Sequence, residues 1–401
     1  MKKLPILLLA LCLTVFSACG AGGVPSTAPT AAPTASPEPT PEPDAAEKAL
    51  AAMTTDQKIG QLFLVRPESL DPALTPEQAH NTALYGATAV SEAMAQTLRD
   101  YPAGGVAVFG KNIVSPKQLK AFTAALQNAS AVPLLLGIDE EGGSVSRIAG
   151  TKGFDVPRYN SAESVGATGD PAQAEAMGAA IGSYLAEYGF NLDFAPVADV
   201  NTNPNNIVIG SRAFGSDPAL VAKMVSAEIA GLHRAGVMTC AKHYPGHGDT
   251  TGDTHDGYVS VTKTWDELKA CELVPFTAAM DAGTDMIMAA HITAVNVTDD
   301  GLPASLSKEM ITDRLRDGLG WNGVVITDAL SMGAVLNNYS SADAAVKAVL
   351  AGADILLMPY DYKAAFNGVK DAVADGTISQ ARLDESVLRI LDLKMRYGLL
   401  K

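Results

Sequence analysis

The stretch from Lys242 to His255 gathers side chains that can transfer protons, bind metal ions or hold hydroxyl groups. It reads Lys-His-Tyr-Pro-Gly-His-Gly-Asp-Thr-Thr-Gly-Asp-Thr-His and contains three of the six histidines in the chain. Because its proline and glycines disfavour a regular helix, we expect a long loop. Histidine titrates near neutral pH and suits acid/base chemistry, although His and Asp are also common metal ligands.

Asp253 and His255 form the best pair in this loop for acid/base work. Residues two apart in an extended segment can face the same way, so Asp253 can accept a hydrogen bond from His255 and hold its tautomer. We expect His247 only to hydrogen-bond the backbone of its loop. A metal-dependent barrel enzyme would need ligands on several strands, yet the first apolar run ends in Arg66-Pro67 without a His-x-His pair. We therefore expect no metal ion and no other cofactor.

Further polar side chains stand directly after apolar runs, where a carboxylate is costly unless it serves a polar pocket. Simpler roles remain open for several of them. Asp139 and Asp328 could cap the following helix, and Arg147 (with Glu140 or Glu141) or Arg212 could form an ordinary ion pair. Lys242 adjoins a buried run, and a buried lysine needs a partner. The residues directly after apolar runs are Asp139, Asp199, Lys242, His243, His291 and Asp328.

Eight short apolar runs alternate with helix-like stretches along most of the chain. Such runs predict buried strands of a parallel sheet, and eight strand–helix units predict a (β/α)8 TIM barrel, with an open doubly wound sheet as the alternative. The barrel is favoured because the polar residues follow strand ends, where barrel enzymes hold their active sites. The runs are 59–65, 105–109, 133–138, 191–197, 237–242, 285–290, 323–327 and 353–358, and the main helices expected are 116–128, 171–188, 218–235, 265–282, 307–319 and 342–351.

The first 45 residues do not fit this alternating pattern. Residues 1–18 have a basic start and an apolar run too short for a permanent membrane helix, which predicts a signal peptide. Small residues precede Cys19, as in bacterial lipoprotein signals, so we expect a lipid anchor at Cys19, with simple secretion as the alternative. Residues 19–45 are rich in proline and threonine, which predicts an extended linker. Residues 46–401 then form a single catalytic domain.

Charge and cysteine content limit the partners of the chain. A formal net charge of −15 makes nucleic acid an unsuitable partner. We expect an extracytoplasmic monomer that contacts the membrane only through its lipid anchor. Cys240 lies in an apolar run, which favours a buried thiol, and a disulfide with Cys271 stays open.

Several of these segments resemble one enzyme family. Residues 242–255 resemble the signature loop of family 3 glycoside hydrolases, in their β-N-acetylglucosaminidase branch, with Tyr244 for the commoner Phe and Thr254 for the commoner Ser. Residues 138–147 (Ile-Asp-Glu-Glu-Gly-Gly-Ser-Val-Ser-Arg), 209–214 (Ile-Gly-Ser-Arg-Ala-Phe) and 325–332 (Val-Ile-Thr-Asp-Ala-Leu-Ser-Met) resemble further motifs of the family in the same order. The resemblance covers roughly residues 50–400.

The resemblance implies a set of roles and a reaction. Asp328 would be the nucleophile and His255, held by Asp253, the acid/base. The residues implied to bind sugar hydroxyls are Asp139, Arg147, Arg212, Lys242 and His243. The implied reaction is the retaining, exo-acting release of terminal N-acetylglucosamine (GlcNAc) from cell-wall or chitin-type glycans through a glycosyl-aspartate. Alternatives are a β-glucosidase or glycoside phosphorylase of the same family, a metal-dependent barrel hydrolase and a sugar-binding lipoprotein.

Overall fold

The computed structural model describes residues 45–400, except residues 82, 84–85, 255–256 and 258. The expected signal peptide, Cys19 and nearly all of the linker therefore lie outside the described residues, and so does His255. In the part of the chain that is described, no helix is both long enough and apolar enough to cross a membrane.

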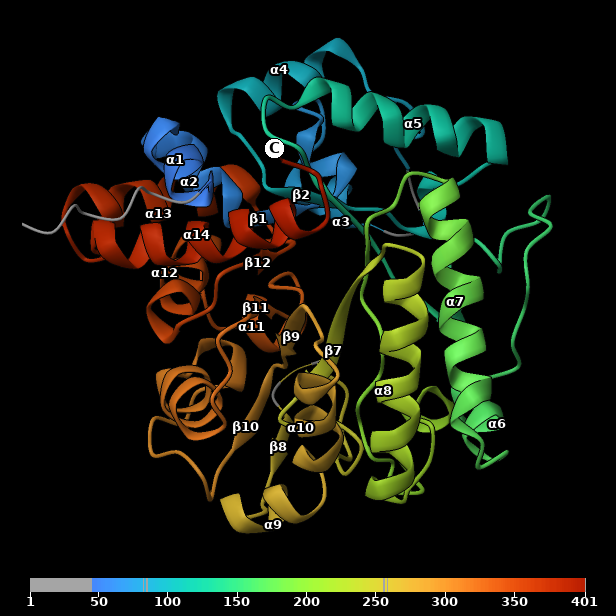
Figure 1. Cartoon of the computed structure of the whole chain (residues 1–401). Coiled ribbons are helices and arrows are strands. Elements are labelled where there is room, and N and C mark those ends of the chain that lie inside the picture. Colours follow the sequence, from blue (N-terminus) through green and yellow to red (C-terminus); the bar gives the residue numbers. More distant parts are fainter. Residues whose placement is uncertain (1–44, 82, 84–85, 255–256, 258, 401) are drawn as a thin grey trace, which may run out of the picture. The chain divides into compact units, whose positions relative to one another are not determined.

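Eight strands form one parallel sheet at the places that the apolar runs predict (Figure 1). Their order is β11-β9-β7-β6-β3-β2-β1-β12. The sheet also closes on itself, because Ile355, next to β12, pairs with Ile326 of β11. The (β/α)8 barrel is therefore confirmed, and the open doubly wound sheet is wrong. The strands are β1 (Phe63–Val65), β2 (Gly105–Ala107), β3 (Leu135–Ile138), β6 (Leu192–Asp193), β7 (Met238–Tyr244), β9 (Met286–Ala289), β11 (Val324–Thr327) and β12 (Leu356–Leu357).

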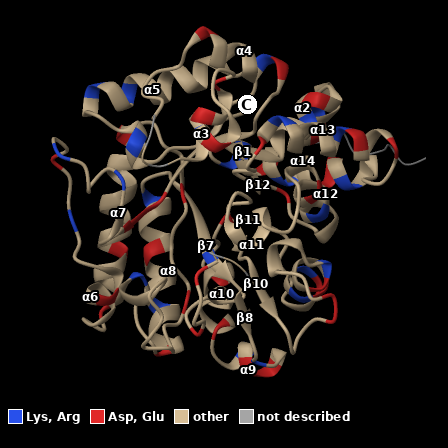
Figure 2. Cartoon of the chain, turned by 180° about the vertical axis from the view of Figure 1, so that it is seen from behind, with Lys and Arg blue, Asp and Glu red and all other residues tan. Residues whose placement is uncertain are grey.

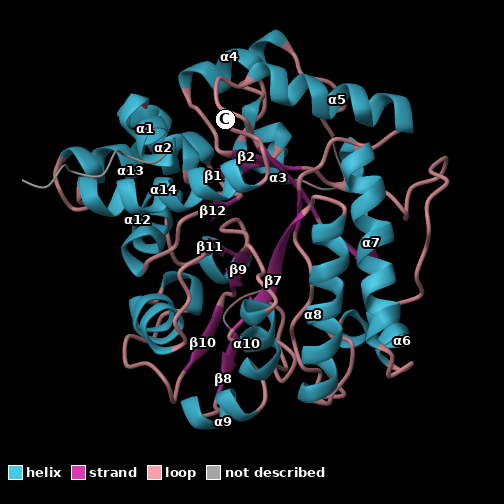
Figure 3. Ribbon diagram, viewed as in Figure 1, coloured by secondary structure: helices cyan, strands magenta, loops and turns pink. Residues whose placement is uncertain are grey.

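Helices connect successive strands of the barrel (Figure 3). Three of them begin with a proline behind a Ser or Asp whose side chain accepts a backbone N–H, as the prolines predict. The α-helices are α1 (Ala45–Ala52), α2 (Thr55–Gln61), α3 (Pro76–His80), α4 (Glu92–Asp100), α5 (Pro116–Ala129), α6 (Ala162–Gly166), α7 (Pro171–Glu187), α8 (Pro218–Arg234), α9 (Trp265–Ala270), α10 (Leu273–Asp281), α11 (Gly333–Leu336), α12 (Ser341–Ala351), α13 (Tyr362–Ala374) and α14 (Gln380–Arg396). The helix expected at 307–319 is a π-helix over Glu309–Gly318.

The stretch 265–282 forms two helices, so the single helix that its pattern predicts is wrong. α9 ends at Ala270 and α10 begins at Leu273. Between them Cys271 has a non-helical backbone, with φ −135° and ψ −79°. The next residue, Glu272, is buried and forms an ion pair with Lys263, which precedes α9. A buried carboxylate needs such a partner. The break itself lies four residues before Pro275, which has no backbone N–H for the carbonyl of Cys271.

Alternate residues of the strands pack into two separate apolar clusters. In β11, Val325 belongs to the larger cluster and Ile326 to the smaller one. Since successive side chains of a strand point to opposite faces, the larger cluster lies between strands and helices and the smaller one fills the barrel interior. Cys240 belongs to the smaller cluster, is fully buried and forms no disulfide with Cys271. The prediction of a buried thiol is therefore confirmed.

Charged residues gather on the outer helices and the connecting loops, while the strands are largely apolar (Figure 2). Two small sheets follow strands of the barrel in the chain. β4 (Glu140–Gly142) and β5 (Val145–Ser146) form an antiparallel pair after β3, and β8 (Val259–Val261) pairs in parallel with β10 (Ile292–Ala294). The charged residues that do occur on the strands or directly after them build the site described next.

Candidate active site

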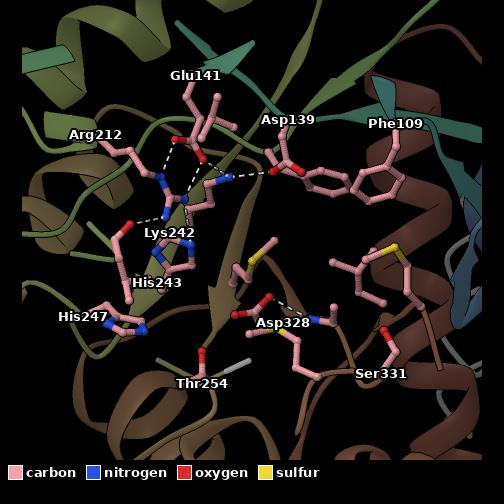
Figure 4. A pocket seen from close by; sticks show the side chains of 18 of the residues that line it. Phe109, Asp139, Glu141, Arg212, Lys242, His243, His247, Thr254, Asp328 and Ser331 are labelled. Carbon is pink, nitrogen blue, oxygen red and sulfur yellow. Dashed lines mark hydrogen bonds and ion pairs between the residues drawn. The ribbon is translucent and has the colours of Figure 1, made fainter. Parts of the chain in front are cut away.

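A cavity of about 430 Å³ opens at the carboxyl ends of the barrel strands. Its wall combines Arg66 after β1, Asp139 after β3, Lys242 in β7 and Asp328 after β11. A closed parallel barrel brings such distant parts of the chain to one face. All five side chains implied to bind sugar hydroxyls line this cavity together with Asp328, and Figure 4 shows most of them facing it.

Lys242 is the centre of a buried ion-pair cluster in the cavity wall (Figure 4). Its Nζ lies 2.7 Å from Asp139 Oδ1 and 2.6 Å from Glu141 Oε1. Arg212 donates two hydrogen bonds of 2.8 Å to the two carboxylate oxygens of Glu141. Arg147 approaches Asp139 Oδ2 to 3.4 Å. The partner that a buried lysine requires is thus a pair of carboxylates.

These contacts keep the cluster charged at neutral pH. Burial opposes ionisation of Asp139, but Lys242 and Arg147 lower its pKa. Burial likewise opposes ionisation of Glu141, and Lys242 with Arg212 lowers the pKa of that carboxyl. Burial disfavours the charged form of Lys242, yet the two carboxylates raise its pKa. The wall therefore presents fixed charged donors and acceptors, a suitable surface for sugar hydroxyls.

The simpler roles considered for these residues are only partly correct. Asp139 binds cations of the cluster rather than the start of a helix. Arg147 pairs with Asp139 and not with Glu140, whose carboxylate accepts the backbone N–H groups of residues 147–149. Arg212 does form an ion pair, but it lines the cavity as well.

Lys242 and His243 are consecutive, and both line the cavity. In a regular strand their side chains would point to opposite faces. The register between β7 and β9 shifts between Ala241 and Tyr244, and irregularities of this kind redirect side chains. The break in register at this point explains how one strand supplies two neighbouring side chains to the site.

Asp199 orients His243. Its Oδ2 lies 2.7 Å from His243 Nδ1, and its Oδ1 accepts the backbone N–H groups of His243 and His247 at 3.3 and 2.6 Å. A carboxylate on Nδ1 keeps the proton there, so Nε2 is the acceptor nitrogen, 3.5 Å from Arg212 Nη2. The position of Asp199 after an apolar run drew attention to it, but its role follows only from this contact.

The glycine-rich loop after β7 borders the cavity with His247 and Thr254. His247 contacts its own loop, since Nδ1 lies 2.7 Å from Thr250 Oγ1, although the contact is with a side chain and not with the backbone that we expected. The residue also lines the cavity. The carbonyl oxygen of Thr254 accepts the backbone N–H of Ala334 at 3.1 Å, which ties the loop to the segment after Asp328. Asp253 is half-buried beside Thr254.

Because His255 lies outside the described residues, the pair of Asp253 and His255 stays a prediction.

Asp328 stands between the charged wall and an apolar wall of the cavity. Its Oδ1 accepts the backbone N–H of Ala329 at 2.7 Å. The next helix, α11, begins only at Gly333, and its N-cap residue is Met332, so Asp328 is not its cap. The apolar residues that line the cavity include Met288, Met332, Leu357 and Met358. A cavity with one polar and one apolar wall suits a sugar, which has polar edges and apolar faces.

Sequence reasoning missed several residues of this site. Glu141 stands in the same motif as Asp139, and its burial between two cations could have been suspected from that motif. Arg66 directly follows the apolar run 59–65, the same signal that marked Asp139, but its contact with Phe109, whose ring centroid lies 4.2 Å from the guanidinium, appears only in the fold. Within the described ranges, no cluster of three or more His, Cys, Asp or Glu side chains is arranged to hold a metal ion.

Comparisons with known proteins agree in one family. Residues 54–393 match the family described as "Glycosyl hydrolase family 3 N terminal domain". Beta-hexosaminidase A of Pseudoalteromonas piscicida is 33% identical over 385 residues, which is 88% of this chain and 62% of that protein. A beta-hexosaminidase of Mycobacterium tuberculosis is 33% identical over 341 residues, covering 82% of this chain and 85% of the relative.

Among solved structures, a family 3 beta-N-acetylglucosaminidase from Paenibacillus sp. superimposes with a TM-score of 0.79 at 37% identity. That match covers 87% of this chain and 63% of the other. This chain therefore spans less than two thirds of the length of the Pseudoalteromonas and Paenibacillus proteins.

Proposed function

Because the chain belongs to glycoside hydrolase family 3 and to its β-N-acetylglucosaminidase branch, we propose that it is a retaining, exo-acting β-N-acetylhexosaminidase. The observation that carries the proposal is one cavity in which Asp328 faces the cluster of Asp139, Lys242 and Arg212. A nucleophile beside fixed hydroxyl ligands is the arrangement that glycoside cleavage requires.

The proposed mechanism is a double displacement. Asp328 attacks the anomeric carbon and forms a glycosyl ester, while His255 gives its proton to the departing oxygen. His255 then takes a proton from water, whose oxygen attacks the anomeric carbon, displaces the Asp328 carboxylate and releases the sugar with retained configuration. The His255–Asp253 pair has an advantage here over a lone carboxylate. With His255 protonated and Asp253 ionised the pair has no net charge, so it places no net second anion beside Asp328 and leaves the nucleophile ionised. Asp253 would hold the tautomer of His255.

The test is hydrolysis of an aryl β-N-acetylglucosaminide compared with the matching aryl β-glucoside. We expect faster release from the first substrate, with the β-anomer of GlcNAc as initial product by NMR. Asp328→Asn should lose at least about a thousandfold in kcat, while Asp313→Asn, on the exposed pair with Lys308, should keep its rate. Turnover by Asp328→Asn at the wild-type rate would refute the nucleophile, and release of the α-anomer would refute retention.

The role of His255 has its own test. His255→Ala should lose about 10²–10⁴-fold on substrates with poor leaving groups and much less on activated aryl glycosides, because only poor leaving groups need the proton. Equal losses on both classes would contradict the assignment.

We propose terminal GlcNAc of cell-wall or chitin-type glycans as the natural target. The β-hexosaminidase names of the relatives support hexosaminides as the class, and the proposal of a wall glycan rests on the extracytoplasmic location expected from residues 1–19. Assays with and without inorganic phosphate separate hydrolysis from phosphorolysis, since only phosphorolysis yields a sugar 1-phosphate.

We further propose that the chain is a monomer anchored outside the cytoplasm by a lipid on Cys19. The wild-type protein expressed in bacteria should partition into detergent, and its N-terminal peptide should carry the mass of acyl chains. Cys19→Ser should be released in soluble form. A wild-type protein without acyl mass would support simple secretion instead, and light scattering of the soluble form tests the monomer.

A further inference from the structure

His291 directly follows an apolar run, yet the proposed reaction gives it no role. Its side chain is fully buried, with 0% of its surface exposed, so it cannot touch a substrate in the cavity. Both ring nitrogens have close partners. Nε2 lies 2.8 Å from the carbonyl oxygen of Ala329, and Nδ1 lies 2.7 Å from Ser305 Oγ. The first contact connects His291 to the residue directly after Asp328.

The contact with Ala329 decides where one ring proton lies. A carbonyl oxygen can only accept a hydrogen bond, so His291 Nε2 carries a proton and donates to Ala329. This holds whether Nδ1 accepts from Ser305 or donates to it. The backbone of His291 is also held, because the residue lies between β9 and β10, and Ile292 of β10 pairs with Val259 of β8. The hydrogen bond to Ala329 therefore has a fixed origin and direction.

The carbonyl of Ala329 belongs to the turn that directly follows Asp328. Asp328 itself is bound to β9, since its N–H donates to the carbonyl oxygen of Ala289 at 2.8 Å. The carbonyl of Ala329 also accepts the N–H of Met332 at 3.0 Å, which is a contact within the turn. The hydrogen bond from His291 is a contact from outside the turn, and it ties this carbonyl to the segment after β9.

The same turn orients the carboxylate of Asp328. Its Oδ1 accepts the backbone N–H of Ala329 at 2.7 Å (Figure 4). Because the N–H and the carbonyl of Ala329 are joined through one Cα, a residue that holds the carbonyl also limits how far the N–H can move. Misplacement of a reacting group by about 1 Å can cost about 10²-fold in rate. A hydrogen bond that acts on Ala329 can therefore act on the rate of attack by Asp328.

We propose that His291 is a positioning residue for the nucleophile: its Nε2–H holds the carbonyl of Ala329, and the N–H of Ala329 in turn holds the carboxylate of Asp328. This inference rests on the proposed function, because it takes Asp328 as the nucleophile. It gives His291 no contact with the sugar. Loss of the hydrogen bond should therefore slow attack on the anomeric carbon without weakening the binding of hydroxyls by Asp139 and Lys242.

The experiment measures the attack by Asp328 alone, with 5-fluoro-N-acetylglucosaminyl fluoride as the probe. The C1–F bond breaks as C1 bonds to an oxygen of Asp328, and fluoride leaves without a proton from an acid. The ring fluorine slows hydrolysis of the ester, so the mass of the intact protein records how fast the ester forms. In His291→Leu we expect this labelling to slow about 10- to 100-fold, while the Kd for GlcNAc, measured by calorimetry, stays within about threefold of wild type.

The outcomes separate the inference from the function on which it rests. Labelling of His291→Leu at the wild-type rate would overturn the inference. So would a Kd for GlcNAc that weakens as much as labelling slows, because the whole site would then depend on His291. A wild-type protein that gains no label on the peptide containing Asp328 would refute the proposed function instead.

Two conservative variants separate the hydrogen bond from the shape of the ring. His291→Gln can place an amide N–H near Nε2 and should label within about fivefold of the wild-type rate. His291→Asn reaches only Ser305, the partner of Nδ1, and should be as slow as His291→Leu. Equal labelling rates in the Gln and Asn variants would overturn the inference, whether or not His291→Leu folds.

Tyr362→Phe is the control for a general loss of stability. The hydroxyl of Tyr362 lies 2.9 and 2.7 Å from the carbonyl oxygens of Tyr101 and Pro102, so this variant also removes a hydrogen bond from a buried side chain to the backbone. None of these three residues lines the cavity. Tyr362→Phe should therefore label at the wild-type rate, and slowing equal to that of His291→Leu would overturn the inference.

Discussion

Replacement of Lys242 by methionine tests how far the buried ion-pair cluster depends on its central charge. The lysine side chain is 2% exposed and lies 2.7 and 2.6 Å from Asp139 and Glu141. Methionine is similar in size but leaves Asp139 with Arg147 at 3.4 Å as its remaining partner in this cluster. Removing one partner of a buried ion pair costs about 3–5 kcal/mol. We expect Lys242→Met to lower the free energy of unfolding by about this amount at pH 7.

The loss of unfolding free energy in Lys242→Met should be smaller at pH 5 than at pH 7, and this change does not come from the wild type. In the wild type, the lowered pKa values of Asp139 and Glu141 give stability that is present above their unfolded pKa of about 4 and is lost as pH falls through the folded values. The raised pKa of Lys242 gives stability that is present below about 10.4 and is lost as pH rises through the folded value. Between pH 5 and 9 the wild-type contribution is therefore constant.

In the Lys242→Met variant, burial raises the pKa of Asp139 because its main counter-charge is absent. Asp139 can then take up a proton in mildly acidic solution, so the deficit relative to wild type should shrink from pH 7 to pH 5. Adding Asp139→Asn to the variant should recover part of the loss at pH 7 for the same reason.

Urea unfolding followed by circular dichroism measures these differences. Lys370→Met is the matched control, because Lys370 forms an exposed ion pair with Asp56 at 2.8 Å, and such pairs contribute about 0–1 kcal/mol. A loss below about 1 kcal/mol for Lys242→Met at pH 7 would refute the reasoning. A loss as large at pH 5 as at pH 7 would refute the part that concerns Asp139.

Three further outcomes follow from the structure. Asp199→Asn removes the charge that fixes the tautomer of His243, so kcat/KM should fall about tenfold or more while the urea midpoint changes little; an unchanged kcat/KM would show that His243 needs no such support. Burial lowers the pKa of Lys394 to about 7, so the folded protein binds fewer protons than the unfolded chain between about pH 7 and 10. Wild-type stability should therefore rise through this window by up to about 1.4 kcal/mol per pH unit, and Lys394→Met should abolish that rise in urea midpoints. Dialysis against EDTA should leave aryl glycosidase activity unchanged, whereas a loss restored by zinc would favour the metal-dependent alternative.

Much of the barrel was predictable because its signals are local. A continuous apolar run is the consequence of a strand buried on both faces, so each of the eight strands left its own mark in the chain. The prolines at the start of α5, α7 and α8 likewise reflect the missing backbone donor that a first helical turn tolerates. The break between α9 and α10 has a local cause that the single-helix prediction overlooked, because Pro275 has no backbone N–H for the carbonyl of Cys271, four residues earlier, and its ring clashes with that carbonyl.

The same distinction between local signals and tertiary contacts applies to the candidate site. Asp139, Lys242 and Asp328 could be chosen from the sequence, since a charged residue at the end of an apolar run is costly without a purpose. Their assembly in one cavity follows from the parallel register of a closed barrel. The sequence also predicted a type of chemistry, because residues 242–255 contain side chains suited to acid/base work and the family resemblance implies a nucleophile and hydroxyl-binding residues.

Only the tertiary structure decided how these groups are held. In the fold, Glu141 lies between Lys242 and Arg212, although Arg212 is 71 residues away from Glu141 in the chain. Asp199 likewise contacts the ring of His243. The fold also placed His247, which contacts Thr250 of its own loop, in the lining of the cavity. The physical reason is that ion pairs and hydrogen bonds between strands depend on spatial neighbours, and residue spacing along one chain does not encode which neighbours a closed sheet creates.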